Sequence, residues 1–252
     1  MGTRLDTTSA TFAFRTLRPH DVHVWSLRLD LAEELRGRLE ALLSADEAAR
    51  ARRFMFAASR AHFVCAHGLL RLILAGYVGV PPHELAIERA PCGKPRLAGG
   101  AGPRFNLSHG GGVGLVAVCA EREVGVDVER VREVGGLVAE RCFSPAERAS
   151  LAAVAAPLRV EAFYAGWTRK EAFLKALGDG LSRRLDSFDV TLAPGEPARL
   201  LRVEGAPEAP ARWALRALRP EPGYVGAVAV EGEGRPVALH RRSWETLAAS
   251  LC

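Results

Sequence analysis

The sequence has no pair of cysteines in a C-x-x-C arrangement and no apolar run long enough to cross a membrane. Its five cysteines are odd in number and widely spaced, which argues against a zinc or redox dithiol motif; they are Cys65, Cys92, Cys119, Cys142 and Cys252. The longest apolar stretches are interrupted by Arg71 or are much shorter than the roughly twenty residues of a transmembrane helix. The first residues carry Arg4 and Asp6 and do not resemble a signal peptide. We therefore expect reduced thiols and a cytoplasmic protein.

A strong excess of one charge sign is also absent. The net charge is +5 over 252 residues, which fits an anionic partner without naming one. A hydrophobic content of 48% is enough for the core of one large domain or two small ones. Charge alone leaves a non-catalytic basic binding module, such as a nucleic-acid binder, as an alternative.

The chain reads as two similar halves, residues 1–122 and 123–252. Residues 111–118 (GGVGLVAV) and 223–230 (GYVGAVAV) are identical at six of eight positions, and both are typical of a buried strand after a tight turn. Capping-box patterns begin at Ser44 and Ser144, and each Ser is followed 19 residues later by a Phe that opens a longer helical pattern. The alternative is a chance match among abundant Gly, Ala and Val. We expect an α+β fold made by duplication of two α/β halves, with the active site in the cleft between them.

Two carboxylates lie on a predicted strand just after the junction between the halves. In residues 124–129 (VGVDVE) the alternation of a strand places Asp127 and Glu129 on the face opposite the valines. Like charges this close repel unless a cation neutralises them, so the strand is a candidate metal platform. The alternative is an edge strand with a charged, solvated face.

A helix predicted over residues 161–177 carries the next candidates. Its apolar side chains leave Lys170, Glu171 and Lys175 on more polar faces. Glu171 and Lys175 are four residues apart and therefore neighbours on one face. They are either a surface ion pair or a catalytic pair, in which Glu171 reaches a metal or an attacking hydroxyl and Lys175 faces phosphates.

Cationic and hydrogen-bonding residues that suit phosphates lie in the first half. Lys94 stands in a Gly-Lys-Pro turn, and Ser108 and His109 follow a short strand and precede a glycine-rich loop whose N–H groups could approach an anion. Arg50 belongs to a charged helix predicted over residues 46–53, which is otherwise typical of a solvated face. With the three carboxylates, these residues indicate a metal-assisted transfer of a phosphoryl-linked group. Another Mg²⁺-dependent enzyme acting on a nucleotide or pyrophosphate would use the same carboxylates.

In their order and spacing, the four motifs at residues 93–95, 106–109, 125–129 and 167–175 resemble those of the large, Sfp-like 4′-phosphopantetheinyl transferases. The resemblance implies a pseudo-dimer of two α/β halves with coenzyme A between them. It also implies that Mg²⁺ is held by Asp127, Glu129 and Glu171, and that coenzyme A phosphates are contacted by Lys94, Ser108 and His109. Glu171 would then deprotonate a serine of an apo acyl or peptidyl carrier protein, and Lys175 would stabilise the leaving group, adenosine 3′,5′-bisphosphate.

Three positions depart from the family pattern. His67 stands where many relatives carry Arg, Glu47 where some carry Lys, and Gly110 where a second Ser is usual. The departures would weaken contacts to coenzyme A, for which Arg50 and Arg71 are candidate replacements. The resemblance places carrier recognition in residues 178–189, with Leu181 and Phe188 as apolar candidates, although Phe188 is expected in the core. A duplicated chain that forms its own cleft needs no second copy, so we expect a monomer.

Overall fold

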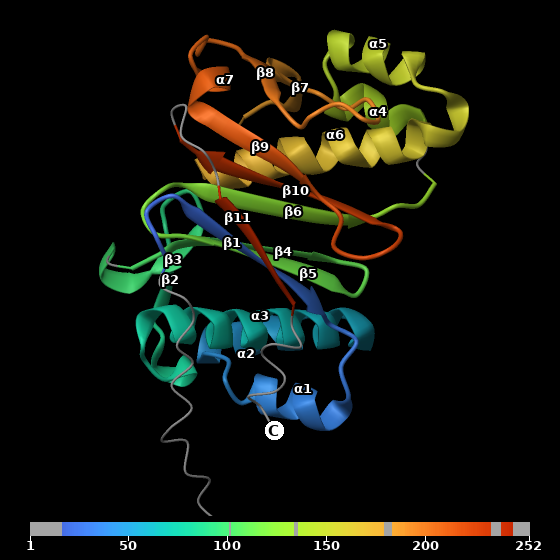
Figure 1. Ribbon diagram of the computed structural model, residues 1–252. Coiled ribbons are helices and arrows are strands. Elements are labelled where there is room, and N and C mark those ends of the chain that lie inside the picture. The colour runs from blue at the N-terminus through green and yellow to red at the C-terminus, as the bar shows by residue number, and fades with distance from the viewer. Residues whose placement is uncertain (1–16, 101, 134–135, 179–182, 233–237, 244–252) are drawn as a thin grey trace, which may run out of the picture.

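The computed structural model describes residues 17–100, 102–133, 136–178, 183–232 and 238–243 (Figure 1). The chain alternates helices and strands, as predicted for a mixed α+β fold. The elements in the first part are β1 (Asp21–Arg28), α1 (Glu33–Glu40), α2 (Ala45–Arg52), α3 (Ala57–Val78), β2 (Ile87–Arg89), β3 (Pro95–Leu97), β4 (Arg104–Gly110) and β5 (Val113–Cys119). They are followed by β6 (Val124–Arg130), α4 (Gly136–Cys142), α5 (Pro145–Ala153), α6 (Ala156–Leu177), β7 (Phe188–Val190), β8 (Leu200–Val203), α7 (Ala209–Arg212), β9 (Trp213–Leu218), β10 (Tyr224–Glu231) and β11 (Ala238–Ser243).

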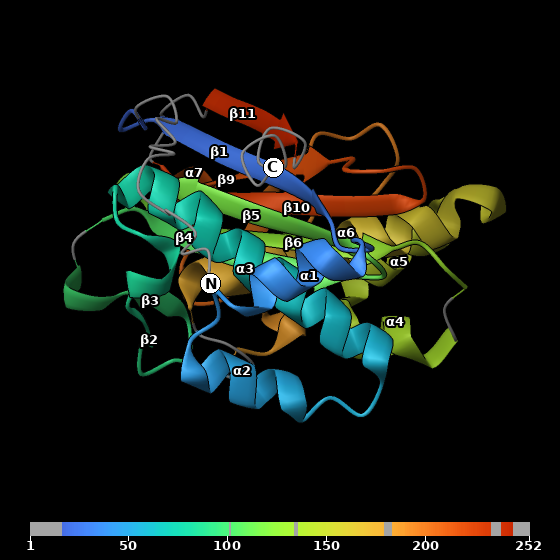
Figure 2. The same ribbon diagram turned by 90° about the horizontal axis from the view of Figure 1, so that it is seen from below.

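Four layers are stacked through the molecule. Figure 1 shows α3, a sheet of order β11-β1-β5-β4, a sheet of order β6-β10-β9, and α6, from bottom to top. Figure 2 views the same stack from the side of α1, α2 and α3. Each sheet therefore packs a helix on one face and the other sheet on the opposite face, so both of its faces are buried.

Strand alternation explains why the two glycine- and valine-rich segments are apolar along their whole length. In β5, Val116 and Val118 belong to the cluster around α3, while Leu115 and Ala117 face the second sheet. Strand β10 divides in the same way, with Ala227 and Ala229 toward α6 and Val228 and Val230 toward the first sheet. A strand buried on both faces has no polar side, which is why the sequence shows a run and not an alternation.

Both predicted capping boxes are present. The Ser44 and Ser144 hydroxyls accept hydrogen bonds from the backbone N–H groups of Glu47 and Glu147, whose carboxylates accept from the Ser N–H groups in return. The long helices begin earlier than predicted, at Ala57 and Ala156, because the sequence pattern detects the apolar face and not the exposed first turns.

Helix α3 is the long helix of the first part of the chain. It continues through Gly76 to Val78 and ends at Gly79, whose φ of 77° suits a residue without a Cβ. By length and composition α3 could cross a membrane, and it is the one such helix in the described ranges. Its apolar face instead packs on the first sheet, so it serves as a core helix.

The prediction that Lys170 lies on a polar face is wrong. Its side chain is fully buried, and Nζ lies 2.7 Å from Glu147 Oε2. Its Nζ also donates to the carbonyl oxygens of Leu185 and Phe188. The surrounding chain supplies polar partners for this lysine, which a helical periodicity cannot reveal.

The last described strand returns to the first sheet. Strand β11 pairs in parallel with β1, with Asp21 opposite Ala238 and Ser26 opposite Ser243. Sheet pairing therefore crosses the predicted boundary between residues 122 and 123, and that division into halves stays a prediction.

Candidate active site

Strand β6 and helix α6 lie against each other at the centre of the candidate site. A Cβ on Gly125 would stand 2.1 Å from the Ala172 carbonyl oxygen and 2.3 Å from the Ala176 nitrogen, so only glycine permits this approach. The valines of β6 face the first sheet, which leaves Asp127 and Glu129 on the α6 side as predicted. Close packing thus brings the strand carboxylates to the helix that carries Glu171 and Lys175.

Asp127, Lys175 and Ser108 form one hydrogen-bonded cluster. Lys175 Nζ donates to Asp127 Oδ1 at 2.6 Å and to Ser108 Oγ at 2.9 Å, and Ser108 Oγ donates to the same Asp127 oxygen at 2.8 Å. Asp127 is buried, whereas the Lys175 side chain is 29% exposed. Strand β4 supplies Ser108 and the second sheet's strand β6 supplies Asp127, so the cluster joins the two sheets. The sequence predicted all three residues for the site.

Glu171 and Glu129 lie in the electrostatic field of the same aspartate. Burial, and then the charge of Asp127, raise the pKa of Glu171, while Lys175 opposes the shift. The pKa of Glu129 is raised by the same two causes in the same order, and a hydrogen bond from Trp167 opposes it. Arg132 also opposes the shift at Glu129, but the three acidic groups still outnumber the two cations, which leaves excess negative charge in a half-buried region. The hydrogen bond from Trp167 to Glu129 was not predicted from the sequence.

The acidic cluster suits a hard cation but is not pre-formed as a metal site. Asp127 Oδ2 is fully buried and has no hydrogen-bond partner, so it is an unused acceptor. Within the described ranges, no three His, Cys, Asp or Glu side chains stand together closely enough to enclose an ion. Carboxylate oxygens are the ligands that Mg²⁺ prefers, and Mg²⁺ commonly keeps waters or phosphate oxygens in its remaining positions. The chemistry of these carboxylates therefore suits Mg²⁺ whose remaining positions are filled by waters or phosphate oxygens.

His109 follows Ser108 at the end of β4. Burial lowers its pKa to about 4, and the charges of His67, His62 and Lys175 add to the effect. The imidazole is therefore neutral near pH 7, where it donates one hydrogen bond. An anion beside it would offset these causes and raise the pKa.

The glycine-rich turn after His109 lies against side chains. A Cβ on Gly112 would stand 2.5 Å from Asp30 Oδ2, and Tyr224 donates a hydrogen bond to the Gly111 carbonyl oxygen. Both glycines have positive φ, of 58° and 92°. The positive φ angles of Gly111 and Gly112 thus allow a tight hairpin turn beside the Asp30 carboxylate. This negative charge disfavours the expected approach of a phosphate to Gly112.

Lys94 lies beside the C-terminal end of α6, the end that carries Lys175. Its Nζ donates to Glu123 Oε2 at 2.6 Å and to the Ala176 carbonyl oxygen at 2.7 Å. A cavity of about 210 Å³ opens beside it and is lined in part by Pro95, Phe105 and Leu177. Lys94 therefore lies near the helix that carries Lys175, but its ammonium group is already paired with the Glu123 carboxylate.

The two arginines offered as replacement cations differ. The Arg50 guanidinium lies 5.2 Å from the centre of the Phe63 ring, and Arg50 is exposed. Arg71 is buried, and Nε donates to Glu47 Oε2 at 2.7 Å. Its Nη1 donates to the carbonyl oxygens of Pro82 and Leu85. The expectation that Arg71 contacts coenzyme A is wrong because its donors are used inside the core, whereas the Arg50 side chain is exposed and lies over Phe63.

The two apolar candidates for carrier recognition are only partly described. Leu181 lies outside the described residues. Phe188 is fully buried and packs on Phe173, as expected for a core residue, so it offers no surface to a partner.

Two family models together match residues 32–229 of the chain. The "4'-phosphopantetheinyl transferase, N-terminal" model matches residues 32–122, and the "4'-phosphopantetheinyl transferase superfamily" model matches residues 123–229. The 4′-phosphopantetheinyl transferase HetI of Nostoc sp. is 40% identical over 224 residues, which are 87% of this chain and 91% of the relative. The chain belongs to the 4′-phosphopantetheinyl transferase superfamily. It is an Sfp-like member of this enzyme class, and its reaction is the transfer of phosphopantetheine.

More distant relatives agree with that assignment. The transferase Sfp of Bacillus subtilis is 26% identical over 86% of this chain and 95% of its own length. Among solved structures, a complex of "Chronobacterium ammoniagenes ACPS" with CoA shares 24% identity over 46% of this chain and 99% of that chain, at a TM-score of 0.34. So low a TM-score supports no statement about this chain.

Proposed function

We propose that this transferase moves the 4′-phosphopantetheine arm of coenzyme A to a serine hydroxyl of an apo acyl or peptidyl carrier protein, with Mg²⁺ as cofactor. The observation that carries the proposal is the buried Asp127 bonded to both Lys175 and Ser108, with Glu171 on the preceding turn of the same helix. A phosphate-handling site with excess carboxylate is what such a reaction requires.

The metal would be held by Asp127, Glu129 and Glu171. The orphaned Oδ2 of Asp127 and the raised pKa values of both glutamates, which are caused by burial and by Asp127, support this assignment. Bound Mg²⁺ would neutralise the pyrophosphate and make its phosphorus more electrophilic. Because Asp127 already binds Lys175, the lysine balances part of the carboxylate charge before the metal enters.

Glu171 is the candidate general base. Its carboxylate would take the proton of the carrier serine as the serine oxygen attacks the β-phosphorus of coenzyme A. The bond from that phosphorus to the oxygen of adenosine 3′,5′-bisphosphate breaks, and Lys175 would stabilise the negative charge on the leaving oxygen. A base with a raised pKa is better matched to neutral pH than an ordinary carboxylate.

Donor binding would use Lys94, Ser108, His109 and Arg50. To bind a phosphate, Lys94 must give up its ion pair with Glu123. This loss reduces the contribution of Lys94 to the binding free energy of the donor. His109 would gain a proton as a phosphate raises its pKa from about 4, so donor binding would take up a proton.

The proposal also includes a duplicated fold with the active site between the halves, a monomeric state and a cytoplasmic location. Support for duplication comes from the matching order of capped helix, long helix and buried strands in residues 1–122 and 123–252.

Incubation with coenzyme A and a panel of apo-carrier proteins, followed by intact mass, tests the transfer. Each served carrier should gain one phosphopantetheine arm with Mg²⁺ and none with a chelator. Failure on every carrier would favour another Mg²⁺-dependent enzyme that acts on a nucleotide or pyrophosphate. A basic binding module predicts instead a steep salt dependence and indifference to Glu171→Ala.

Metal binding has a separate readout. Mg²⁺ alone should raise the melting temperature of the wild type, because it binds only the folded carboxylate cluster. Asp127→Asn should remove that shift while circular dichroism stays native. An equal shift in both proteins would place the metal elsewhere.

A further inference from the structure

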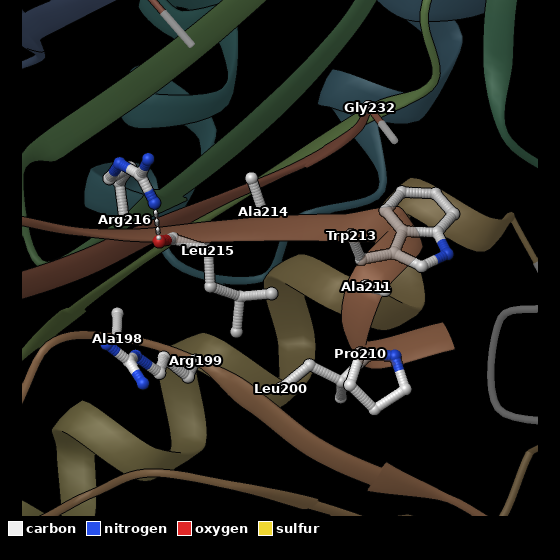
Figure 3. A pocket seen from close by; sticks show the side chains of 10 residues that line it. All are labelled: Ala198, Arg199, Leu200, Pro210, Ala211, Trp213, Ala214, Leu215, Arg216 and Gly232. Carbon is white, nitrogen blue, oxygen red and sulfur yellow. Dashed lines mark hydrogen bonds between the residues drawn. The ribbon is translucent and has the colours of Figure 1, made fainter. Parts of the chain in front are cut away.

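A groove of about 460 Å³ lies on the outer flank of the second sheet (Figure 3). Its walls come from the start of β8, from α7 and from β9, and it shares no residue with the candidate active site. Strand β10 separates β9 from β6, which carries Asp127. The volume falls within the range of about 300 to 1,000 Å³ that is usual for ligand pockets.

Two strand edges line this groove. Strand β9 is the last strand of its sheet, and β8 is paired only with β7 among the described residues. The Gly232 N–H donates to the Arg212 carbonyl oxygen, so alternation along β9 turns the backbone groups of Trp213, Leu215 and Ala217 away from β10, toward the groove side. An edge of this kind is a template for one more strand.

Two arginines stand together at one end of the groove. Figure 3 shows Arg199 and Arg216 on opposite walls at the same end, with Trp213 and Pro210 at the other. Both arginines are exposed, and neither has a carboxylate partner in the part of the chain that is described. The guanidinium of Arg216 donates only to the carbonyl oxygen of Leu215. By contrast, the nearby Arg202 and Arg212 are paired with Asp189 and Glu231.

We propose that this groove binds an extended acidic segment of a partner protein, which adds to β9 as a strand. The carboxylate of the segment would pair with Arg199 and Arg216, and an apolar side chain would lie against Trp213. Trp213 and Arg216 are three residues apart, about 10 Å at 3.3 Å per residue, and their side chains leave opposite faces of the strand. An added strand shares this pleat, so it should place its apolar and acidic residues three positions apart.

Labelled heptapeptides that hold one aspartate three positions after Leu, Ile, Phe or Trp test the proposal with the full chain. At least one should raise fluorescence anisotropy with a Kd below about 1 mM. Moving the aspartate by one position, or replacing it with asparagine, should weaken binding about tenfold or more, because a charged pair or the shared pleat is lost.

Matched variants localise the site. The double variant Arg199→Glu with Arg216→Glu should lose binding about tenfold or more, while the exposed Arg148→Glu should not. Ala217→Pro removes an N–H donor from the unpaired edge of β9 and should weaken binding, whereas Ala217→Val keeps the donor and should bind like the wild type. Native circular dichroism and unchanged transfer activity would show that these variants are folded.

Three results would overturn the proposal. The first is no binding by any peptide of the panel at about 1 mM. The second is equal binding by the charge-reversed variant, or by Ala217→Pro and Ala217→Val. The third is self-association of the wild type that Ala217→Pro abolishes, which would make the occupant a second copy of this chain.

Discussion

Glu147 and Lys170 form an ion pair of 2.7 Å in which neither side chain is more than 2% exposed. Lys170 Nζ also lies 4.2 Å from the centre of the Phe188 ring. Glu47 and Arg71 make an ion pair of the same length in the first half, and both glutamates belong to capping boxes. In each half the cation also donates to two carbonyl oxygens of the following chain. This correspondence supports the proposed duplication more specifically than the short Gly-Val match does.

Breaking the Glu147 pair should be costly. Lys170→Met leaves a buried carboxylate and two carbonyl oxygens without their donor, so we expect a loss of about 3 to 5 kcal/mol in the free energy of unfolding by denaturant. The double variant Glu147→Gln with Lys170→Met should recover part of that loss. Arg148→Met, on the exposed face of α5, is the control and should change stability by less than about 0.5 kcal/mol. A loss no larger than that of the control would mean that the pair does not stabilise the fold.

Acid should destabilise the fold in part by protonating Glu47. Burial raises the pKa of this carboxyl, but hydrogen bonds from His67, Ser44 and Arg71 outweigh it and lower the pKa to about 2. Because the folded pKa lies below the unfolded value, the stabilisation is complete above about pH 4.5 and is lost as the pH falls toward 2. In Glu47→Gln this part of the pH dependence should disappear, with a loss of about 3 kcal/mol at pH 7. Chemical denaturation measures the free energy of unfolding of the wild type and of Glu47→Gln at each pH. If the two values change in parallel from pH 5 to pH 3, the prediction is wrong.

Gly125 should tolerate no side chain. Gly125→Ala places a Cβ against the backbone of α6, which cannot move without separating Lys175 from Asp127. We expect a loss of about 1 to 3 kcal/mol in stability and a lower kcat. Gly37→Ala is the control, since a Cβ there meets nothing within 4 Å, and it should stabilise α1 by up to about 1 kcal/mol. Thermal melts and transfer assays on both variants decide the point.

Glu171→Gln should abolish the proposed base. A loss of about 10²- to 10⁴-fold in kcat is expected, with native circular dichroism. The control is Glu161→Gln on the same helix, which loses only an exposed pair with Arg219 and should keep full activity. Full activity in Glu171→Gln would assign proton transfer to another group.

Lys175 should set the acid limb of the pH profile. Its charge opposes the burial and the Asp127 charge that raise the pKa of Glu171, so Lys175→Met should raise that pKa further. Because the base is active when deprotonated, the acid limb of kcat/KM should move to higher pH, and kcat should fall. Lys175→Arg keeps the charge and should restore the limb but not all of kcat, because the guanidinium differs in shape. If the acid limb of kcat/KM stays at the same pH in Lys175→Met, Lys175 does not affect the pKa of the general base.

The sequence predicted best where local rules suffice. The capping boxes, the two all-apolar strands and the faces of Asp127 and Glu129 follow from short-range patterns, and the structure has them. Local patterns contain no information on hydrogen-bond acceptors in distant segments. Lys170 was therefore predicted on a polar face, and Arg71 was predicted to contact coenzyme A. Their carbonyl partners lie 11 to 18 residues away in segments that fold back.

Within the candidate site, residue types and order singled out Ser108, Asp127 and Lys175, which lie together, but not the bonds between them. The contact of Ser108 with Asp127 spans 19 residues, and that of Lys175 with Asp127 spans 48. The bond of Lys94 to Glu123 and the hydrogen bond of Trp167 to Glu129 depend on where α6 crosses the sheet, and only the folded packing fixes that position.

The parallel pairing of β11 with β1 also bears on the order of synthesis. Strand β1 leaves the ribosome before the other described elements, and its neighbour β11 leaves after all of them. Until residues 238–243 emerge, one edge of the first sheet is unpaired or covered by other means, although β4 and β5 are already available. The first sheet is therefore completed only after the whole second sheet has been synthesised.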